Sequence, residues 1–145
     1  IAAGGYSNRV DIWDVRSGVL LNRCQSSQGN IFDSVKFGAE GKIVVAGDFN
    51  GRLIGWNVEN GRERFNIKGH GRKVTGLTFS PDGTRLASSS WDGSIKLWET
   101  SRWQAVTTLE EHPGRVTSVS FSRDGQWLSS TGNRRVVVRR IKSSR

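Results

Sequence analysis

Residues 73 to 98 decide the fold: Lys73-Val-Thr-Gly-Leu-Thr-Phe-Ser-Pro-Asp-Gly83, Thr84-Arg-Leu-Ala-Ser-Ser-Ser-Trp-Asp-Gly93 and Ser94-Ile-Lys-Leu-Trp98. Each of the three pieces has the pattern of a short strand bounded by turn residues. Val74, Leu77 and Phe79 are the apolar anchors of the first piece. Pro81-Asp82-Gly83 predicts a tight turn, because proline fixes φ and glycine accepts a positive φ. The stretch therefore predicts successive β-strands joined by short turns.

The same pattern occurs before and after this stretch. The copies are 32–41, 42–51 and 52–56 upstream, 116–125, 127–131 and 136–138 downstream, and a partial copy at 2–5 and 10–13. Tryptophans stand at positions 13, 56 and 98, at spacings of 43 and 42 residues. A period of about 40–45 residues with four strands in each unit is typical of a propeller blade.

Gly69-His70, the turn that contains Asp92, and Ile95-Lys-Leu-Trp98 resemble the WD-repeat family. The resemblance implies an all-β fold, a β-propeller of four-stranded antiparallel blades. We expect about three and a half blades: a partial blade at 1–28, blades at 29–70 and 71–112, and a partial last blade at 113–145. Propellers close into rings of typically 4–8 blades, so we expect a larger, seven-bladed ring. The other blades would come from a longer chain or from another copy.

Three residues of the clearest repeat, His70, Asp92 and Trp98, together with a serine at 88, 89 or 90, could suggest a catalytic triad. The family resemblance implies instead a structural hydrogen-bond network between strands and the preceding loop. The two neighbouring repeats lack one or more of these residues. The preceding repeat has Gln28 and Asn50 at the His and Asp positions, and the last repeat keeps His112 but has Arg134 and Arg139 near the Asp and Trp positions.

Two repeat positions are candidates for partner binding on the top face that the resemblance implies. One position is aromatic in three repeats, as Tyr6, Phe49 and Trp91. The other precedes the first strand and holds Ile31, Lys73 or Arg115. Aromatic residues are enriched at interface hot spots, and basic residues could bind an acidic peptide or a phosphate. The alternatives are packing against the adjacent blade for the rings and simple solvation for the charges.

The net charge of +9 is concentrated near the end of the sequence. Residues 113–145 contain eight Lys or Arg residues and one acid, Asp124. The candidates for a phosphate or acidic-surface contact are Arg134, Arg135, Arg139, Arg140 and Lys142. Basic patches favour phosphate backbones and acidic surfaces. Val136, Val137 and Val138 offer no stacking aromatics, so we do not expect base-specific reading; a merely solvated edge is the third possibility.

We expect no catalytic, metal or cofactor site. His70 and His112 occupy the same repeat position in different blades, and the glycines lack the lysine of a phosphate-binding loop. The lone Cys24 excludes an internal disulfide and is expected to be a small buried hydrophobe. Trp103 could form a contact on the side of the ring, and Trp127 could be exposed or lie in the inter-blade core.

Three functional hypotheses remain. The first is a non-catalytic scaffold that docks protein partners within a multi-subunit complex. The second is a ribonucleoprotein or ribosome-assembly component that contacts RNA through its basic last blade. The third is a targeting or sensor domain of a longer, enzyme-bearing chain. No apolar run is long enough to span a membrane, and the single cysteine favours an intracellular location, the cytoplasm or the nucleus. Because the sequence begins at Ile1 and has no Met, we expect a piece of a longer protein or a chain whose ends are missing.

Overall fold

The computed structural model describes residues 1–5 and 8–141, and its regular elements there are strands apart from one turn of 3-10 helix, Ala39–Gly41. The first sheet contains β1 (Ala2–Ala3), β2 (Arg9–Trp13) and β3 (Leu20–Gln25). The second contains β4 (Phe32–Phe37), β5 (Ile43–Asp48), β6 (Arg52–Asn57) and β7 (Glu63–Lys68). The third contains β8 (Val74–Phe79), β9 (Arg85–Ser90), β10 (Ile95–Glu99) and β11 (Gln104–Leu109). The fourth contains β12 (Val116–Phe121), β13 (Trp127–Gly132) and β14 (Arg135–Arg140).

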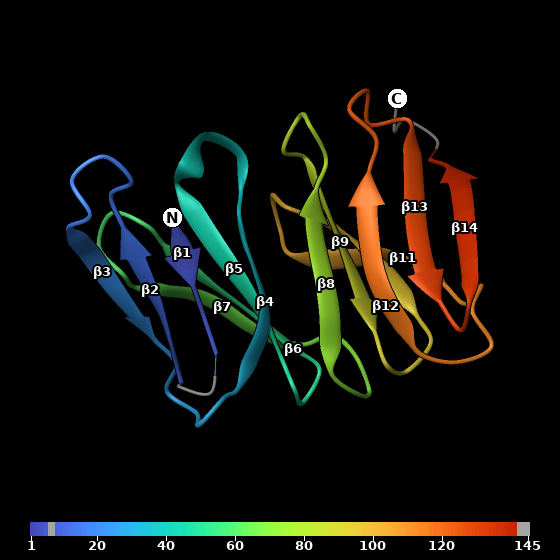
Figure 1. Ribbon diagram of the computed structural model, residues 1–145, viewed down its shortest axis with the longest axis horizontal. Helices are drawn as coiled ribbons and strands as arrows, with labels where there is room; N and C mark the ends of the chain where they lie inside the picture. The colour runs from blue at the N-terminus through green and yellow to red at the C-terminus, as the bar shows by residue number, and fades with distance from the viewer. Residues whose placement is uncertain (6–7, 142–145) are drawn as a thin grey trace.

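Each sheet is an antiparallel meander, and the sheets follow one another in sequence order (Figure 1). The first strands of the last three sheets lie together, with β4 against β8 and β8 against β12. The two three-stranded sheets stand at opposite ends of the row in Figure 1. The all-β fold of antiparallel blades is therefore confirmed, with four strands in each of the two inner sheets and three in each outer sheet among the described residues. Within the described residues no helix is long and apolar enough to cross a membrane.

The core lies between neighbouring sheets, because each inner sheet is covered on both faces. Val44 and Ala46 of β5 pack in the cluster shared with the first sheet, whereas Val45 packs in the cluster shared with the third. This alternation follows from the two-residue period of a strand. A third cluster joins the third and fourth sheets through residues such as Ala87 and Val119.

The turns at one end of the sheets, between β5 and β6, β9 and β10, and β13 and β14, position the candidate binding residues. Gly51 and Gly93 have φ angles of +82° and +92° in the first two of these turns. The third turn has two consecutive left-handed residues, Asn133 and Arg134, with φ angles of 48° and 59°. Two such residues form the tight hairpin turn that matches strand twist, and the turn presents Arg134 to solvent.

Candidate functional site

A buried chain of hydrogen bonds connects β9, β10 and the loop before β8. The indole Nε1 of Trp98 donates to Ser88 Oγ at 2.8 Å, and Ser88 Oγ lies 2.7 Å from His70 Nε2. On the other side of the ring, His70 Nδ1 lies 3.0 Å from Ser94 Oγ and 3.3 Å from Asp92 Oδ2. Asp92 also accepts hydrogen bonds from the Ser94 hydroxyl at 2.6 Å and the Ser94 amide at 2.9 Å. The structure thus joins the three predicted residues through two serines.

The protonation states of this network follow from its burial. Burial lowers the pKa of His70 to about 4, even though the nearby Asp92 carboxylate raises it. Burial alone would raise the pKa of Asp92, but hydrogen bonds from Ser94 and the Gly71 amide lower it to about 2. His70 is therefore neutral at pH 7, and its contact with Asp92 is a hydrogen bond. The Ser94 hydroxyl donates to Asp92, so it accepts from His70 Nδ1, and the ring proton lies on Nδ1. Nε2 is then an acceptor, and the Ser88 hydroxyl donates to it while accepting from the Trp98 N–H.

The other repeats use different networks at the same place. In the second sheet, buried Asn30 bonds to Ser26 and to Asp48, and Trp56 Nε1 donates to the Gln25 carbonyl at 3.3 Å. Asn30 and Asp48 each lie two residues from the equivalents of His70 and Asp92, which are Gln28 and Asn50, so the repeat pattern does not identify them.

The last sheet keeps one half of the network. His112 Nε2 lies 2.9 Å from Ser130 Oγ, as His70 does from Ser88. Arg139 pairs with Glu111 at the edge of this sheet.

Aromatic rings and cations alternate in a row across three sheets at the end that carries the β5–β6 and β9–β10 turns. The Lys73 Nζ lies 4.2 Å from the centroid of the Phe49 ring and 4.8 Å from that of Trp91. The Arg115 guanidinium carbon lies 4.2 Å from the Trp91 centroid. We call Phe49, Lys73, Trp91 and Arg115 the cation–π ladder. The structure therefore joins the aromatic and basic positions, which the sequence treats separately, into one surface.

The backbone places the members of the ladder in register. The Trp91 amide donates to the Lys73 carbonyl at 3.0 Å, which holds the turn beside the first strand of the same sheet. Lys73 and Arg115 each reach back to the ring of the preceding sheet. Tyr6, the remaining aromatic candidate, lies outside the described residues.

The two cations of the ladder differ in their charge partners. Lys73 Nζ lies 2.8 Å from Asp33 Oδ1, and its side chain is only 13% exposed. Arg115 is exposed, and among the described residues it has no carboxylate within ion-pair distance. A cation over an aromatic face gains about 0.5–1 kcal/mol at an exposed site, which favours the rotamers that place Arg115 over Trp91.

The basic candidates of the last sheet lie on its terminal hairpin. Arg134, Arg135, Arg139 and Arg140 are exposed, whereas Lys142 lies outside the described residues. Because side chains alternate along a strand, Arg135 and Arg139 share one face of β14, and Arg140 shares the other with Val136 and Val138. Glu111 neutralises Arg139. The hairpin is thus basic, but it does not present its arginines as a single stripe.

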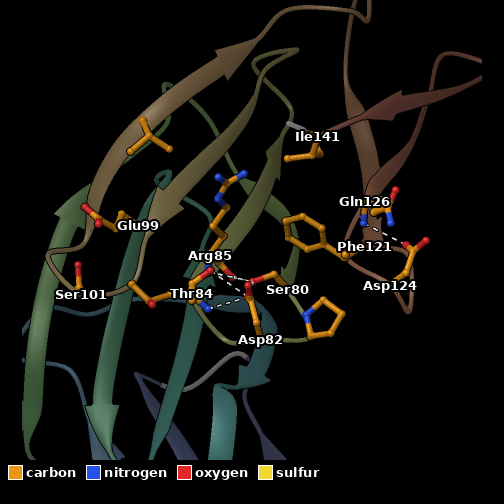
Figure 2. Close-up of a pocket in the computed structure, with 14 residues that line it drawn as sticks. Ser80, Asp82, Thr84, Arg85, Glu99, Ser101, Phe121, Asp124, Gln126 and Ile141 are labelled. Atoms are coloured by element: carbon orange, nitrogen blue, oxygen red, sulfur yellow. Dashed lines mark hydrogen bonds between the residues drawn. The ribbon is translucent and has the colours of Figure 1, made fainter. Parts of the chain in front are cut away.

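A cleft of about 630 Å³ lies between the third and fourth sheets, at the end opposite the ladder (Figure 2). Pro81, Phe121 and Ile141 line it together with the carboxylates of Asp82 and Asp124. Each carboxylate accepts hydrogen bonds within its own turn, and these lower the pKa of Asp82 and of Asp124. The repeated Ser-x-Asp-Gly turn signals the two walls in the sequence, but not the space between them.

Three further sequence predictions concern the aromatic residues and the cysteine. Cys24 is buried, as expected, and burial raises the pKa of its thiol to about 11. Trp103 does not form a side-surface contact; its ring stacks on Phe65 of the second sheet at 4.1 Å and meets Phe79 edge-on at 6.5 Å. Trp127 is 43% exposed and does not belong to the inter-blade core. In the described part of the chain, no three His, Cys, Asp or Glu residues are grouped to hold a metal ion.

Antiparallel sheets in a row, with their first strands packed together and a buried His–Ser–Trp network, define a set of propeller blades. Residues 61–99 and 103–138 match the family model described as "WD domain, G-beta repeat". These two stretches cover just over half of the sequence. The chain therefore belongs to the WD-repeat family, whose members serve in general as scaffolds for protein interaction.

A relative shares part of this sequence. Over 77 residues the chain is 35% identical to Autophagy-related protein 16 of Arabidopsis thaliana. The similar region takes in 53% of this chain but only 15% of the length of that protein. Because the similar region is a small part of that protein, the similarity supports only the general class, a protein-interaction scaffold.

Proposed function

We propose that this chain is a non-catalytic scaffold that docks protein partners of a multi-subunit complex through the cation–π ladder. The single observation that carries the proposal is the continuity of the ladder across three sheets, from Phe49 to Arg115. Tryptophan and arginine are the residues most enriched at interface hot spots. The ladder residues flank strands that are hydrogen-bonded within sheets, so we expect partner binding to require little ordering of the backbone.

The exposure of the two ends of the ladder supports a binding role, whereas Lys73 and Trp91 between them are only partly exposed. Phe49 is 39% exposed and Arg115 is exposed, although both sit at the end of well-buried sheets. Each ring already lies under a cation, so part of the side-chain order that a partner requires is present before binding. A pre-oriented aromatic surface of this kind suits a protein segment that lies across the turns.

Affinity capture of the full chain, read by mass spectrometry, tests the proposal. The variant carries Phe49→Ala and Trp91→Ala, and the matched control carries Trp127→Ala, which removes an exposed tryptophan far from the ladder. We expect the ladder variant to lose specific partners that the wild type and the Trp127 control retain. Equal recovery from all three proteins would refute docking at the ladder.

RNA contact through the basic hairpin is the second candidate, favoured by the four exposed arginines of residues 134–140. Capture with and without nuclease distinguishes the two. Partners that disappear after nuclease, and in a variant with Glu at positions 134, 135, 139 and 140, would indicate a nucleoprotein. Such binding would also weaken steeply with salt, because each phosphate contact releases counterions.

The four sheets are proposed to be consecutive blades of a larger ring, with blade boundaries at 28/29, 70/71 and 112/113. The packing of β4, β8 and β12 side by side supports this arrangement. Within the described residues β14 also has no strand on its outer side. Electron microscopy of the full-length protein that contains these repeats would show whether seven blades close the ring.

A further inference from the structure

The second and third sheets share a unit made of a cation, an aromatic ring and a carboxylate. Lys73 lies over Phe49 and pairs with Asp33, and both partners belong to the preceding sheet. Asp33 occupies a β-bulge, because the register between β4 and β5 shifts between Phe32 and Ser34. A bulge re-aims one side chain, and here it directs the carboxylate of Asp33 toward the next sheet.

The third and fourth sheets repeat this unit without its carboxylate. Arg115 lies over Trp91 as Lys73 lies over Phe49. Thr75 occupies the equivalent bulge, where the register between β8 and β9 shifts between Val74 and Gly76. Its hydroxyl also reaches the next sheet and donates to the carbonyl of Val116, the neighbour of Arg115, at 2.8 Å. A neutral threonine thus stands where the preceding unit has an acid.

The surroundings of Arg115 favour an external anion. Arg115 is exposed, its guanidinium lies over the Trp91 ring, and it has no carboxylate partner among the described residues. The loop before it touches the basic hairpin, since a Cβ placed on Gly114 would lie 2.5 Å from Asn133 Nδ2. Arg134, the exposed residue after Asn133, adds positive potential beside the site.

We propose that an anionic side chain of a partner polypeptide completes this second unit by binding the Arg115 guanidinium over Trp91. The planar guanidinium offers paired N–H donors that match a carboxylate or a phosphate. Trp91 supports the guanidinium from one side, with the Arg115 guanidinium carbon 4.2 Å from the ring centroid. The proposal rests on docking at the cation–π ladder and adds to it the chemical class of the docked group.

Degenerate peptide libraries test the proposal with the full chain. Four libraries carry a central glutamate, phosphoserine, glutamine or serine, with random flanking residues, and the bound fraction is read by mass spectrometry. We expect the wild type to enrich peptides from the anionic libraries over the neutral ones. Enrichment from both anionic libraries indicates any anionic side chain, and enrichment from phosphoserine alone indicates phosphorylated partners.

Three variants show whether Arg115 and the empty acid position carry the effect. Arg115→Gln should weaken binding of the enriched peptides about tenfold, the loss expected for one charge-assisted contact. Thr75→Asp should weaken binding by a similar factor, because it supplies an internal carboxylate for Arg115. The control is Thr75→Asn, since asparagine has the shape of aspartate without its charge, and this variant should bind the peptides as the wild type does. Thermal melts of the three variants identify any loss that comes from unfolding, and Arg115→Gln keeps the test valid if both Thr75 variants unfold.

Several outcomes would overturn the proposal. Equal enrichment from neutral and anionic libraries would do so, as would binding that survives both Arg115→Gln and Thr75→Asp in folded proteins. Binding of a fluorescent oligouridylate that is lost in Arg115→Gln, without enrichment of anionic peptides, would assign the site to nucleic acid instead. If Phe49→Ala and Trp91→Ala abolish partner capture while Arg115→Gln does not, the ladder docks partners but the anion proposal fails.

Discussion

Replacing Ser88 with alanine removes the atom that connects His70 and Trp98. The Ser88 side chain is fully buried, and it lies 2.7 Å from His70 Nε2 and 2.8 Å from Trp98 Nε1. The substitution leaves one ring nitrogen and one indole N–H buried without a partner. Each unsatisfied buried polar group costs about 1–3 kcal/mol. We expect the free energy of unfolding to fall by about 2–4 kcal/mol, since some local relaxation recovers part of the loss.

The second sheet shows how such a relaxation can occur. It has Ala46 at the position of Ser88, and Trp56 Nε1 donates instead to the Gln25 carbonyl, at 3.3 Å. That sheet has Gln28 in place of the histidine, so its alanine leaves no ring nitrogen unpaired. In the third sheet His70 remains, and the loss in Ser88→Ala cannot be fully recovered.

Urea unfolding and thermal melts of the full chain measure the effect. A loss of this size is a large part of a typical stability of about 5–15 kcal/mol, and corresponds to a melting temperature lower by roughly 6–12 °C. The matched control is Ser130→Ala, which leaves only His112 without its partner and should cost about 1–2 kcal/mol. Our interpretation of the network would be wrong if Ser88→Ala changed the unfolding free energy by less than about 0.5 kcal/mol, or if both variants lost the same amount.

Three further predictions concern acid stability, sheet packing and one turn. The pKa of His70 is about 4 in the folded chain against an ordinary 6.5. As the pH falls, His70 therefore binds a proton in the unfolded chain before it does in the folded chain, and the free energy of unfolding should decrease by about 3 kcal/mol between pH 6.5 and about pH 4. Urea titrations at several pH values should show this slope in the wild type, and His70→Gln should flatten it; an unchanged slope would assign the effect to other groups. Trp103→Ala removes the stack on Phe65 and should lower the free energy of unfolding by about 2–4 kcal/mol. Trp127→Ala, at an exposed tryptophan, is the control and should lower it by less than about 0.5 kcal/mol. Similar melting temperatures of the two variants would contradict the inter-sheet role of Trp103. Gly51→Ala places a Cβ against the His70 carbonyl at a φ of +82° and should lower the free energy of unfolding by about 3 kcal/mol or more. Its control, Gly41→Ala, also has a positive φ, +67°, but its Cβ would meet open space, so the loss should be about 1–2 kcal/mol. Equal losses in thermal melts would show that the contact with the His70 carbonyl adds nothing.

The strands and their grouping could be predicted because local rules and the repeat agree. Turn residues such as Pro81-Asp82-Gly83 separate short apolar strands, and the tryptophan spacing gives the length of one unit. The choice among the serines at 88, 89 and 90 could not be made from the pattern alone. Alternation places Ser89 on the opposite face, where it meets Thr75, but both Ser88 and Ser90 face the same side. Only the three-dimensional approach of His70 and Trp98 selects Ser88.

The candidate binding surface was predictable in its positions but not in its contacts. Phe49 and Trp91 fall at one repeat position, Lys73 and Arg115 at another, and both positions are visible in the sequence. Their alternation in space depends on the angle between neighbouring sheets, which no repeat pattern gives. Trp103 was misplaced for the same reason, because its partner Phe65 belongs to a different sheet.

The repeat places Arg115 where the preceding unit has Lys73, but within the described part of the chain Arg115 lacks the carboxylate partner that Lys73 has. Two neighbouring units share a bulge, an aromatic ring and a cation, so the backbone and the distances are nearly the same in both. Both units keep the kinds of side chain, with Lys73 over Phe49 in the first and Arg115 over Trp91 in the second, but the acid of the first, Asp33, is replaced by the neutral hydroxyl of Thr75 in the second. Because Lys73 is already neutralised, it contributes mainly to holding the sheets together. Arg115 retains its charge for a partner, and Thr75→Asp gives the second unit the acid of the first without altering the guanidinium.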